Sequence, residues 1–189
     1  MTAPRPLVQL IVASTRPGRV GEPIGQWIAA RARERGDLEV EIVDLAQVDL
    51  PMFAEPNHPR TGQYTLDSTR EFSAMIDRAA GFILVYPEYN HSYNAALKNA
   101  LDHLNREWAG KPVGLVSYGG VAAGARATIA LEPVLLALGT TPLVGAAVPI
   151  PFVSQFLEGE GDQRRFAPND AVGQGADAML DALTKRLVG

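Results

Sequence analysis

Two spacings of apolar residues alternate along the chain, one typical of strands and the other of helices. Short, almost unbroken apolar runs predict parallel strands that are covered on both faces, at residues 7–13, 82–86 and 113–117. Residues 39–44 alternate at first and predict a less buried strand, and residues 142–148 supply a fifth. Between these runs, helical spacing predicts helices whose apolar stripes start at residues 24, 72, 97, 131 and 176.

The sequence also indicates where some of these helices begin and end. Gly36 follows the first helical stripe and predicts a C-cap, because glycine adopts the left-handed conformation freely. Asn90 or Ser92 is predicted as the N-cap of the third helix. That helix is expected to carry a single apolar stripe of Leu97, Leu101, Leu104 and Trp108.

Strand and helix alternate five times, which implies parallel strands joined by right-handed crossovers, with helices on both faces of one sheet. No repeat or linker divides the chain, so we expect a single three-layer α/β domain over residues 1–189. Ligands of such sheets bind at the carboxyl ends of the strands. The loops that follow residues 13, 86 and 117 are therefore the places to look for chemistry.

Composition excludes several classes of protein. The chain has 189 residues and no cysteine, which removes disulfides, zinc–thiolate sites and thiol nucleophiles. Its net charge of −4 comes without basic blocks, which argues against a nucleic-acid binder. The uncharged stretch 133–157 is interrupted by four prolines, so we expect no membrane-spanning helix and a cytoplasmic protein.

The loop after the first strand suits a phosphate. It contains the hydroxyls of Ser14 and Thr15 and the guanidinium groups of Arg16 and Arg19, and it leads into a helix near residue 22. Free N–H groups and the helix dipole attract anions there, and arginines add charge-assisted donors. A polar turn with solvated arginines is the alternative. Neither glycine-rich nucleotide fingerprint is present, so the loop favours a terminal monophosphate over a pyrophosphate or triphosphate.

Two further loops carry groups that suit a flat ring. The segment 87–94 places two tyrosines, a histidine and two asparagines within eight residues, directly after the third strand. The segment 117–120 ends in two glycines, which permit close backbone approach to a ligand and expose N–H groups. Together the three loops outline a site with a phosphate at one end and a planar heteroaromatic ring at the other.

Other chemistry-bearing residues favour ordinary structural roles. The histidines are too few and too widely spaced for a metal site: His58, His91 and His103. We expect His103 at the surface or an interface, while His91 could approach a substrate. Asp44 ends the second strand and is expected to cap a helix or anchor a loop. Trp27 and Trp108 lie on apolar stripes and are predicted to be core or interface residues. No serine lies in a Gly-x-Ser-x-Gly elbow.

Four segments occur in order between about residues 7 and 155: Ser14-Thr-Arg-x-Gly-Arg, Pro87-Glu-Tyr-Asn-His, Leu97-Lys-Asn-Ala-Leu-Asp102, and Ser117-Tyr-Gly-Gly120 with Arg126-Ala127. In these segments the chain resembles the NADPH-dependent FMN reductase family, which includes quinone, azo-dye and chromate reductases. The resemblance implies a flavodoxin-like fold with five parallel strands in the order 2-1-3-4-5. It also implies FMN as cofactor and NADPH or NADH as co-substrate.

The resemblance further implies roles for individual residues. The FMN phosphate would lie at the first loop, on Ser14, Thr15, Arg16, Arg19, Val20 and Gly21. The isoalloxazine ring would lie against Pro87, Glu88, Tyr89, Asn90 and His91, with its pyrimidine edge along Ser117, Tyr118, Gly119 and Gly120. The last three residues are expected to donate N–H groups to negative charge that grows on the reduced ring. Departures from the family pattern at 94–96 and 122–123 could alter which acceptor fits.

The resulting hypothesis is an oxidoreductase with ping-pong turnover. NAD(P)H would reduce bound FMN and leave before a quinone, flavin, azo compound or similar acceptor enters. Two alternatives stay open: a flavodoxin-type electron carrier without a nicotinamide step, and a flavin-free nucleotide-binding regulator. Carriers of that type tend to be strongly acidic, and a net charge of −4 is mild.

Two segments suggest self-association. Residues 143–156 and the loop 52–64 are more apolar or proline-rich than the surface of a monomer needs. In the family that the chain resembles, such segments help to form dimers, often paired into tetramers, with the flavin near the interface. We therefore expect a homodimer or homotetramer.

Overall fold

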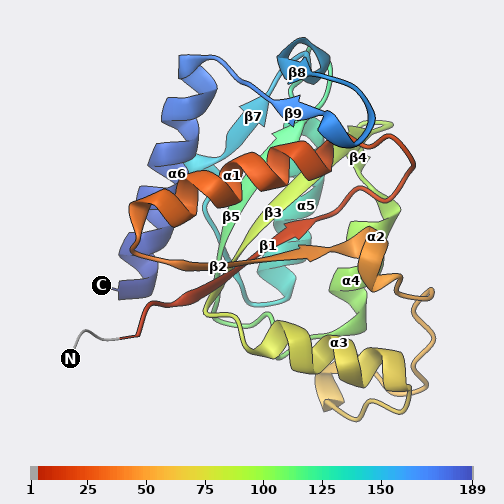
Figure 1. Ribbon diagram of the computed structural model, residues 1–189. Coiled ribbons are helices and arrows are strands. Elements are labelled where there is room, and N and C mark those ends of the chain that lie inside the picture. The colour runs from red at the N-terminus through yellow and green to blue at the C-terminus, as the bar shows by residue number, and fades with distance from the viewer. Residues whose placement is uncertain (1–3, 189) are drawn as a thin grey trace.

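The computed structural model describes residues 4–188 and contains one parallel sheet at its centre (Figure 1). Its strands are β1 (Leu7–Val12), β2 (Glu39–Asp44), β3 (Gly81–Tyr89), β5 (Pro112–Tyr118), β6 (Thr141–Pro142) and β7 (Val148–Ile150). They lie in the order β2-β1-β3-β5, with β6 and β7 both paired to β5, and all of these pairings are parallel. The predicted order 2-1-3-4-5 is confirmed.

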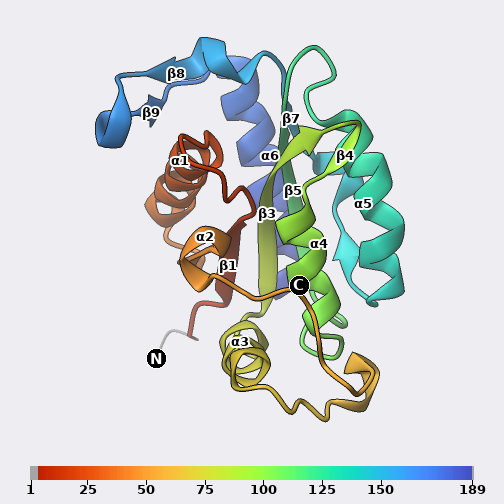
Figure 2. The same ribbon diagram turned by 90° about the vertical axis from the view of Figure 1, so that its right-hand side faces the viewer.

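Helices cover both faces of the sheet (Figure 2). One face packs against α1 (Gly21–Arg35) and α6 (Asp170–Val188), and the other against α3 (Asp67–Asp77), α4 (Ala95–His103) and α5 (Ala125–Ala137). Successive strand side chains point to opposite faces, so Leu10 and Val12 join the first core while Ile11 joins the second. This two-sided burial explains why β1, β3 and β5 are apolar almost throughout.

The fifth strand differs from its prediction. Residues 142–148 do not form one strand, because β6 and β7 are separated by a 3-10 turn over Val144–Ala146. Proline has no N–H to donate to a ladder, and Pro142 and Pro149 limit each strand to a short pairing with β5. The chain therefore returns to β5 at two places rather than along one continuous edge.

The third predicted helix is also shorter than its apolar stripe. Helix α4 ends at His103, Leu104 is extended, and Trp108 lies in the turn that follows. Trp108 still enters the core, with its ring centroid 4.9 Å from that of Phe82. The expectation that His103 lies at the surface is wrong, because its ring is buried near Phe72 and its Nδ1 lies 2.7 Å from the carbonyl oxygen of Asn99.

Several local predictions hold. Gly36 adopts φ = 73° and its N–H donates to the Arg33 carbonyl at 3.1 Å, as expected of a C-cap. Asp44 caps the short helix α2 (Leu45–Val48) by accepting from the N–H of Ala46 at 3.0 Å. No helix within residues 4–188 is long and apolar enough to cross a bilayer.

One element has no counterpart in the sequence predictions. Strands β8 (Leu157–Glu158) and β9 (Arg165–Phe166) form an antiparallel hairpin that lies against α1 (Figure 1). The rings of Trp27 and Phe166 meet edge to face at 5.3 Å, and Arg164 donates to the carbonyl oxygen of Gly18 at 3.1 Å. The hairpin thus reaches the loop between β1 and α1.

Buried carboxylates hold the long segment between α2 and α3. Glu55 accepts hydrogen bonds from the N–H groups of Thr65 and Leu66, at 2.8 and 3.0 Å. Glu107 accepts from the hydroxyls of Tyr64 and Ser73, at 3.0 and 2.6 Å. Burial disfavours the charged form of Glu55, but its hydrogen bonds outweigh burial and lower its pKa to about 2.

This lowered pKa predicts a pH-dependent contribution to stability. A carboxyl with a pKa below its unfolded value, about 4.3, stabilises the fold above that value and loses the effect as pH falls toward its folded pKa. We expect Glu55→Gln to lower the free energy of unfolding at neutral pH, and the difference from the parent to shrink steadily as the pH falls from about 4 toward 2. Urea titrations over this range measure it, with Glu39→Gln at an exposed strand position as control. A difference that persists unchanged at low pH would contradict the assignment.

Candidate functional site

The carboxyl ends of three adjacent strands bring the predicted loops together. Val12 pairs with Val85 across β1 and β3, and Pro87 pairs with Tyr118 across β3 and β5. The loops that follow these strands therefore leave the sheet side by side at one edge (Figure 2). The structure thus assembles the three segments that the sequence singled out.

Two buried hydroxyls lie beneath the first turn of α1. A Cβ built on Gly21 would lie 2.7 Å from the hydroxyl of Tyr118 and would clash with Oγ of Ser14. Both hydroxyls are buried, and apart from a weak interaction with each other neither has a hydrogen-bond partner among the described residues 4–188. Buried polar groups are rarely left unpaired, so the pair indicates that a ligand or water completes this place. Burial raises the pKa of Tyr118, so its phenol stays protonated and able to donate.

The Tyr118 side chain is a feature that sequence reasoning missed. The sequence suggested only its backbone N–H as a donor. The register of β5 turns the phenol toward the first loop, where the Ser14 hydroxyl and the charges of Arg16 and Arg19 influence its ionisation. The alternation of side chains along a strand could have given its face, but the distance to Gly21 depends on tertiary packing.

The two arginines of the first loop have different surroundings. Arg19 forms ion pairs with Asp44 and with Glu22, the latter at 3.1 Å. Arg16 is exposed, and its guanidinium carbon lies 5.8 Å from the ring centroid of Tyr89. Arg19 is therefore already held by carboxylates that also fix the loop, whereas Arg16 faces a neutral ring.

The other predicted residues of this loop line the helix start. Val20 occupies the N-cap position of α1 without a side-chain cap bond, which leaves the first N–H groups of the helix open to another acceptor. Thr15, earlier in the same loop, is exposed. The expected anion-attracting helix terminus is thus present.

The second loop is a tight hairpin rather than a capped helix start. Strand β3 continues to Tyr89 and pairs with β4 (Ser92–Tyr93), and the two residues at the turn, Asn90 and His91, have φ of 50° and 68°. The prediction that Asn90 or Ser92 caps the next helix is wrong. Asn94 holds that position, and its side-chain amide donates to the carbonyl oxygen of Ala13 at 2.6 Å.

Side chains at the edge of this hairpin are fixed by a charge pair. The carboxylate of Glu88 accepts from the backbone N–H and from Nε of Arg126, at 3.1 and 2.7 Å. Burial opposes ionisation of Glu88, but Arg126 prevails and lowers its pKa. This pair ties the end of β3 to the start of α5. Tyr89, Asn90 and His91 remain exposed beside it.

The third loop offers fewer free donors than expected. The N–H of Gly119 donates to the carbonyl oxygen of Ile150 at 3.2 Å, so it is already engaged. The hydroxyl of Ser117 donates to the carbonyl oxygen of Ala123 at 3.0 Å and shapes the turn. Gly120 is exposed, and a Cβ there would meet nothing within 4 Å. Of the two glycines, Gly120 is the one with space for a ligand beside it.

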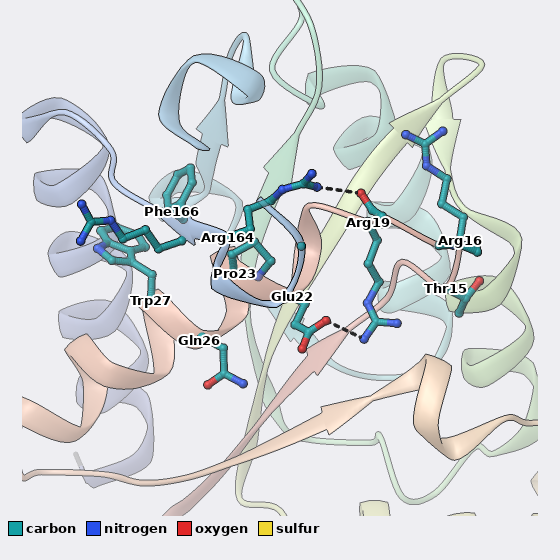
Figure 3. A pocket seen from close by; sticks show the side chains of 13 residues that line it. Thr15, Arg16, Arg19, Glu22, Pro23, Gln26, Trp27, Arg164 and Phe166 are labelled. Carbon is teal, nitrogen blue, oxygen red and sulfur yellow. Dashed lines mark hydrogen bonds and ion pairs between the residues drawn. The ribbon is translucent and has the colours of Figure 1, made fainter. Parts of the chain in front are cut away.

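A cavity of about 820 Å³ opens beside the first loop (Figure 3). It is lined by the loop, by the outer side of the first turns of α1 and by the β8–β9 hairpin. A smaller hollow of about 320 Å³ is also lined by Thr15, together with Met52 and Ala95. Within residues 4–188 no cluster of three or more histidine, aspartate or glutamate residues could hold a metal ion.

Comparison with known proteins agrees with this architecture. Residues 6–155 match the family model of the NADPH-dependent FMN reductases. An NAD(P)H-dependent FMN reductase of Schizosaccharomyces pombe is 40% identical over 121 residues, which cover 63% of this chain and 60% of that protein. Another from Saccharomyces cerevisiae is 33% identical over 155 residues, covering 76% of this chain and 81% of that one.

A solved structure shares the fold. The flavoenzyme NAD(P)H:(acceptor) oxidoreductase from Paracoccus denitrificans matches with a TM-score of 0.75 and 22% identity, covering 96% of this chain and 97% of that one. The arrangement of strands and helices is therefore flavodoxin-like. Because the family match spans most of the sequence and all three loops of the site, this chain belongs to the NADPH-dependent FMN reductase family of oxidoreductases.

Proposed function

We propose that this protein oxidises NAD(P)H with the help of bound FMN and passes the electrons to a small-molecule acceptor such as a quinone, a flavin or an azo compound. The observation that carries the proposal is the pair of unpartnered hydroxyls, Ser14 and Tyr118, beneath the open start of α1. Hydroxyl and backbone donors at a helix N-terminus suit a phosphate monoester. FMN, when bound, supplies the hydride chemistry between nicotinamide and acceptor.

The first loop would hold the phosphate end of the cofactor. Ser14, Thr15 and the N–H groups near Val20 and Gly21 would donate hydrogen bonds, and Arg16 would add a charge-assisted one. Arg19 would act indirectly, because its pairing with Asp44 and Glu22 fixes the loop and leaves less of its charge for a ligand. The phenol of Tyr118 joins this group as a donor from below.

The second and third loops would hold the ring. Pro87 and the hairpin turn at Tyr89, Asn90 and His91 would border its face, with Glu88 and Arg126 keeping the hairpin in place. Gly120 would offer its N–H to the negative charge that develops on the pyrimidine edge. No side chain needs to exchange a proton for the transfer itself, so these residues act by orientation and electrostatics.

The electron-carrier alternative is less consistent with the molecule. A carrier docks on a protein partner through strong charge, whereas the net charge here is −4 and the first loop is rich in arginine. A nucleotide-binding regulator without flavin would use the same kind of phosphate site, so the presence of bound flavin is what separates it from a reductase. Both alternatives are tested by the same experiment.

The test is the response of the purified protein to a nicotinamide nucleotide without oxygen. We expect a yellow protein whose flavin absorption bleaches rapidly when NADPH or NADH is added, and returns when a quinone is added. Stopped-flow absorbance measures both steps. A flavin that stays oxidised in excess nucleotide would favour the carrier, and a colourless protein that takes up no FMN would favour the regulator.

A substitution of Gly21 tests the phosphate assignment. Gly21→Ala places a methyl group against Ser14 and Tyr118, so at least one hydroxyl must move. We expect FMN affinity to fall about tenfold or more, as for the loss of one strong hydrogen bond. Fluorescence titration with FMN measures this. The matched control is Gly175→Ala in α6, where the nearest atom to the new Cβ is 3.8 Å away and FMN affinity should stay at the parent value.

Separate alanine variants of the two arginines test their different roles. Arg16→Ala should weaken FMN binding about tenfold with little change in melting temperature, because it removes a charge-assisted hydrogen bond at an exposed side chain. Arg19→Ala should lower the melting temperature as well, because Asp44 loses its ion-pair partner. Turnover per bound flavin should stay near the parent value in both. Equal melting temperatures for the two variants would refute the division of roles.

We also propose a homodimer or homotetramer in the cytoplasm. Support for self-association comes from exposed apolar side chains around the third loop and α5, namely Val121, Ile129, Leu136 and Phe152. The absence of cysteine is in keeping with a reducing compartment but does not require it. Light scattering of the purified protein decides between a monomer and an assembly.

A further inference from the structure

The cavity of about 820 Å³ beside the first loop is large enough for a ligand of its own. Ligand sites typically enclose roughly 300–1,000 Å³. Three elements form its walls: the first loop, the start of α1, and the β8–β9 hairpin (Figure 3). The proposed ring site lies instead at the ends of β3 and β5, so the cavity extends the flavin site rather than repeating it.

The lining of this cavity is strongly positive. Among the described side chains that line it are Arg16, Arg19, Arg164 and Arg165, together with one acidic residue, Glu22. In a protein whose net charge is −4, this concentration of arginine favours an anionic ligand. Arg19 is paired with Glu22 at 3.1 Å and with Asp44, and Arg165 is paired with Glu158. Arg16 and Arg164 have no carboxylate partner among the described side chains, so they contribute most to the positive charge of the cavity.

Two of these arginines have neutral partners. Arg164 donates to the carbonyl oxygen of Gly18 at 3.1 Å, and Arg16 lies over the ring of Tyr89. Arg165 is paired with Glu158 at 2.8 Å, but its side chain is 76% exposed, and an exposed ion pair of this kind is weak enough for a phosphate to compete with Glu158. A phosphate in the cavity would find guanidinium donors that no buried carboxylate holds.

The remaining wall is apolar and suits a purine. Pro23, Trp27 and Phe166 line it, with the two aromatic rings locked edge to face at 5.3 Å. Aromatic and proline surfaces of this kind cover a flat heterocycle at low entropic cost. A ligand with one purine and one extra phosphate matches both halves of the cavity.

Arg16 lies between the cavity and the hairpin turn at residues 89–91, which borders the proposed ring site. Arg16 is one of the residues that line the cavity, and its guanidinium carbon lies 5.8 Å from the ring centroid of Tyr89, which borders the proposed ring site. A long ligand can therefore pass Arg16, with one end in the cavity and the other at the ends of β3 and β5. NADPH has this composition: a nicotinamide at one end and a 2′-phosphorylated adenosine at the other.

We propose that the cavity binds the 2′-phosphorylated adenosine half of NADPH, and that Arg164 and Arg165 distinguish NADPH from NADH. The inference rests on the proposed function for the identity of the ligand. Both arginines lie beyond residue 155, where the family match ends. The proposed nucleotide preference thus rests on residues outside the matched family segment.

Direct binding tests the proposal without turnover. Adenosine 2′,5′-bisphosphate and 5′-AMP are titrated into the FMN-loaded protein by calorimetry. We expect the bisphosphate to bind about 10- to 100-fold more tightly, as one or two charge-assisted hydrogen bonds allow. Arg164→Ala combined with Arg165→Ala should abolish this preference. Equal affinity of the parent for the two nucleotides, or a preference that survives the double variant, overturns the proposal.

A matched control separates the cavity from a general charge effect. Lys185→Ala with Arg186→Ala removes the same charge from exposed positions in the last turn of α6 and should keep the preference. Loss of the preference in this control overturns the proposal. The conservative Arg164→Lys with Arg165→Lys retains charge and should recover part of the preference, which excludes a folding defect. FMN itself is titrated as well: a second equivalent that only the alanine variant loses would assign the cavity to a flavin and overturn the proposal.

Kinetics then distinguish this inference from the proposed function. The ratio of kcat/KM for NADPH to that for NADH should exceed one in the parent and fall about 10- to 100-fold in the alanine variant. A parent that uses both nucleotides equally refutes the inference and leaves the reductase proposal intact. A protein that prefers the bisphosphate but whose flavin is not reduced by NADPH refutes the reductase proposal instead.

Discussion

The close contact between the first turn of α1 and the ends of β1 and β5 is the constraint on which the site depends. Gly21 has no side chain, so the helix start comes down directly onto the hydroxyls of Ser14 and Tyr118. This contact places the positive end of a 15-residue helix beside two buried hydroxyls, so that both can act on the same anion. A side chain at this position would separate the helix from the strands and open the site.

Polar cross-links hold the three loops in place before any ligand arrives. Arg19 ties the first loop to Asp44 at the end of β2, and Asn94 ties the second loop to Ala13. Glu88 and Arg126 tie the second loop to α5. Ordering of these loops is thus part of folding rather than of binding, which preserves affinity for a ligand. The same links explain why some residues expected to contact the cofactor contact the protein instead.

The β8–β9 hairpin adds a separate layer to this scaffold. It packs on α1 through Trp27 and Phe166 and reaches the first loop through Arg164. Its position over the outer side of α1 converts an exposed helix surface into one wall of a cavity. The flavodoxin-like core and the hairpin therefore contribute differently: the core supplies the edge with the three loops, and the hairpin supplies charge beside it.

The sequence by itself determined the succession of strands and helices along the chain, the burial of the sheet on both faces and the three loops at the carboxyl ends of its strands. Those features follow from local hydrophobic spacing and from the handedness of parallel crossovers, which need no distant contact. It did not determine where the last predicted strand breaks, that α4 ends before Trp108, or that His103 is buried. These depend on which surfaces meet across the core.

Only the tertiary structure decided how individual side chains of the site are used. Arg19 and Arg16 look alike in the sequence, yet only Arg19 forms an ion pair with Asp44, which lies 25 residues further along the chain than Arg19. Likewise, the Tyr118 side chain, at the end of β5, lies against Gly21 at the start of α1. Partners of this kind are set by packing between distant segments, and local pattern carries no information about them.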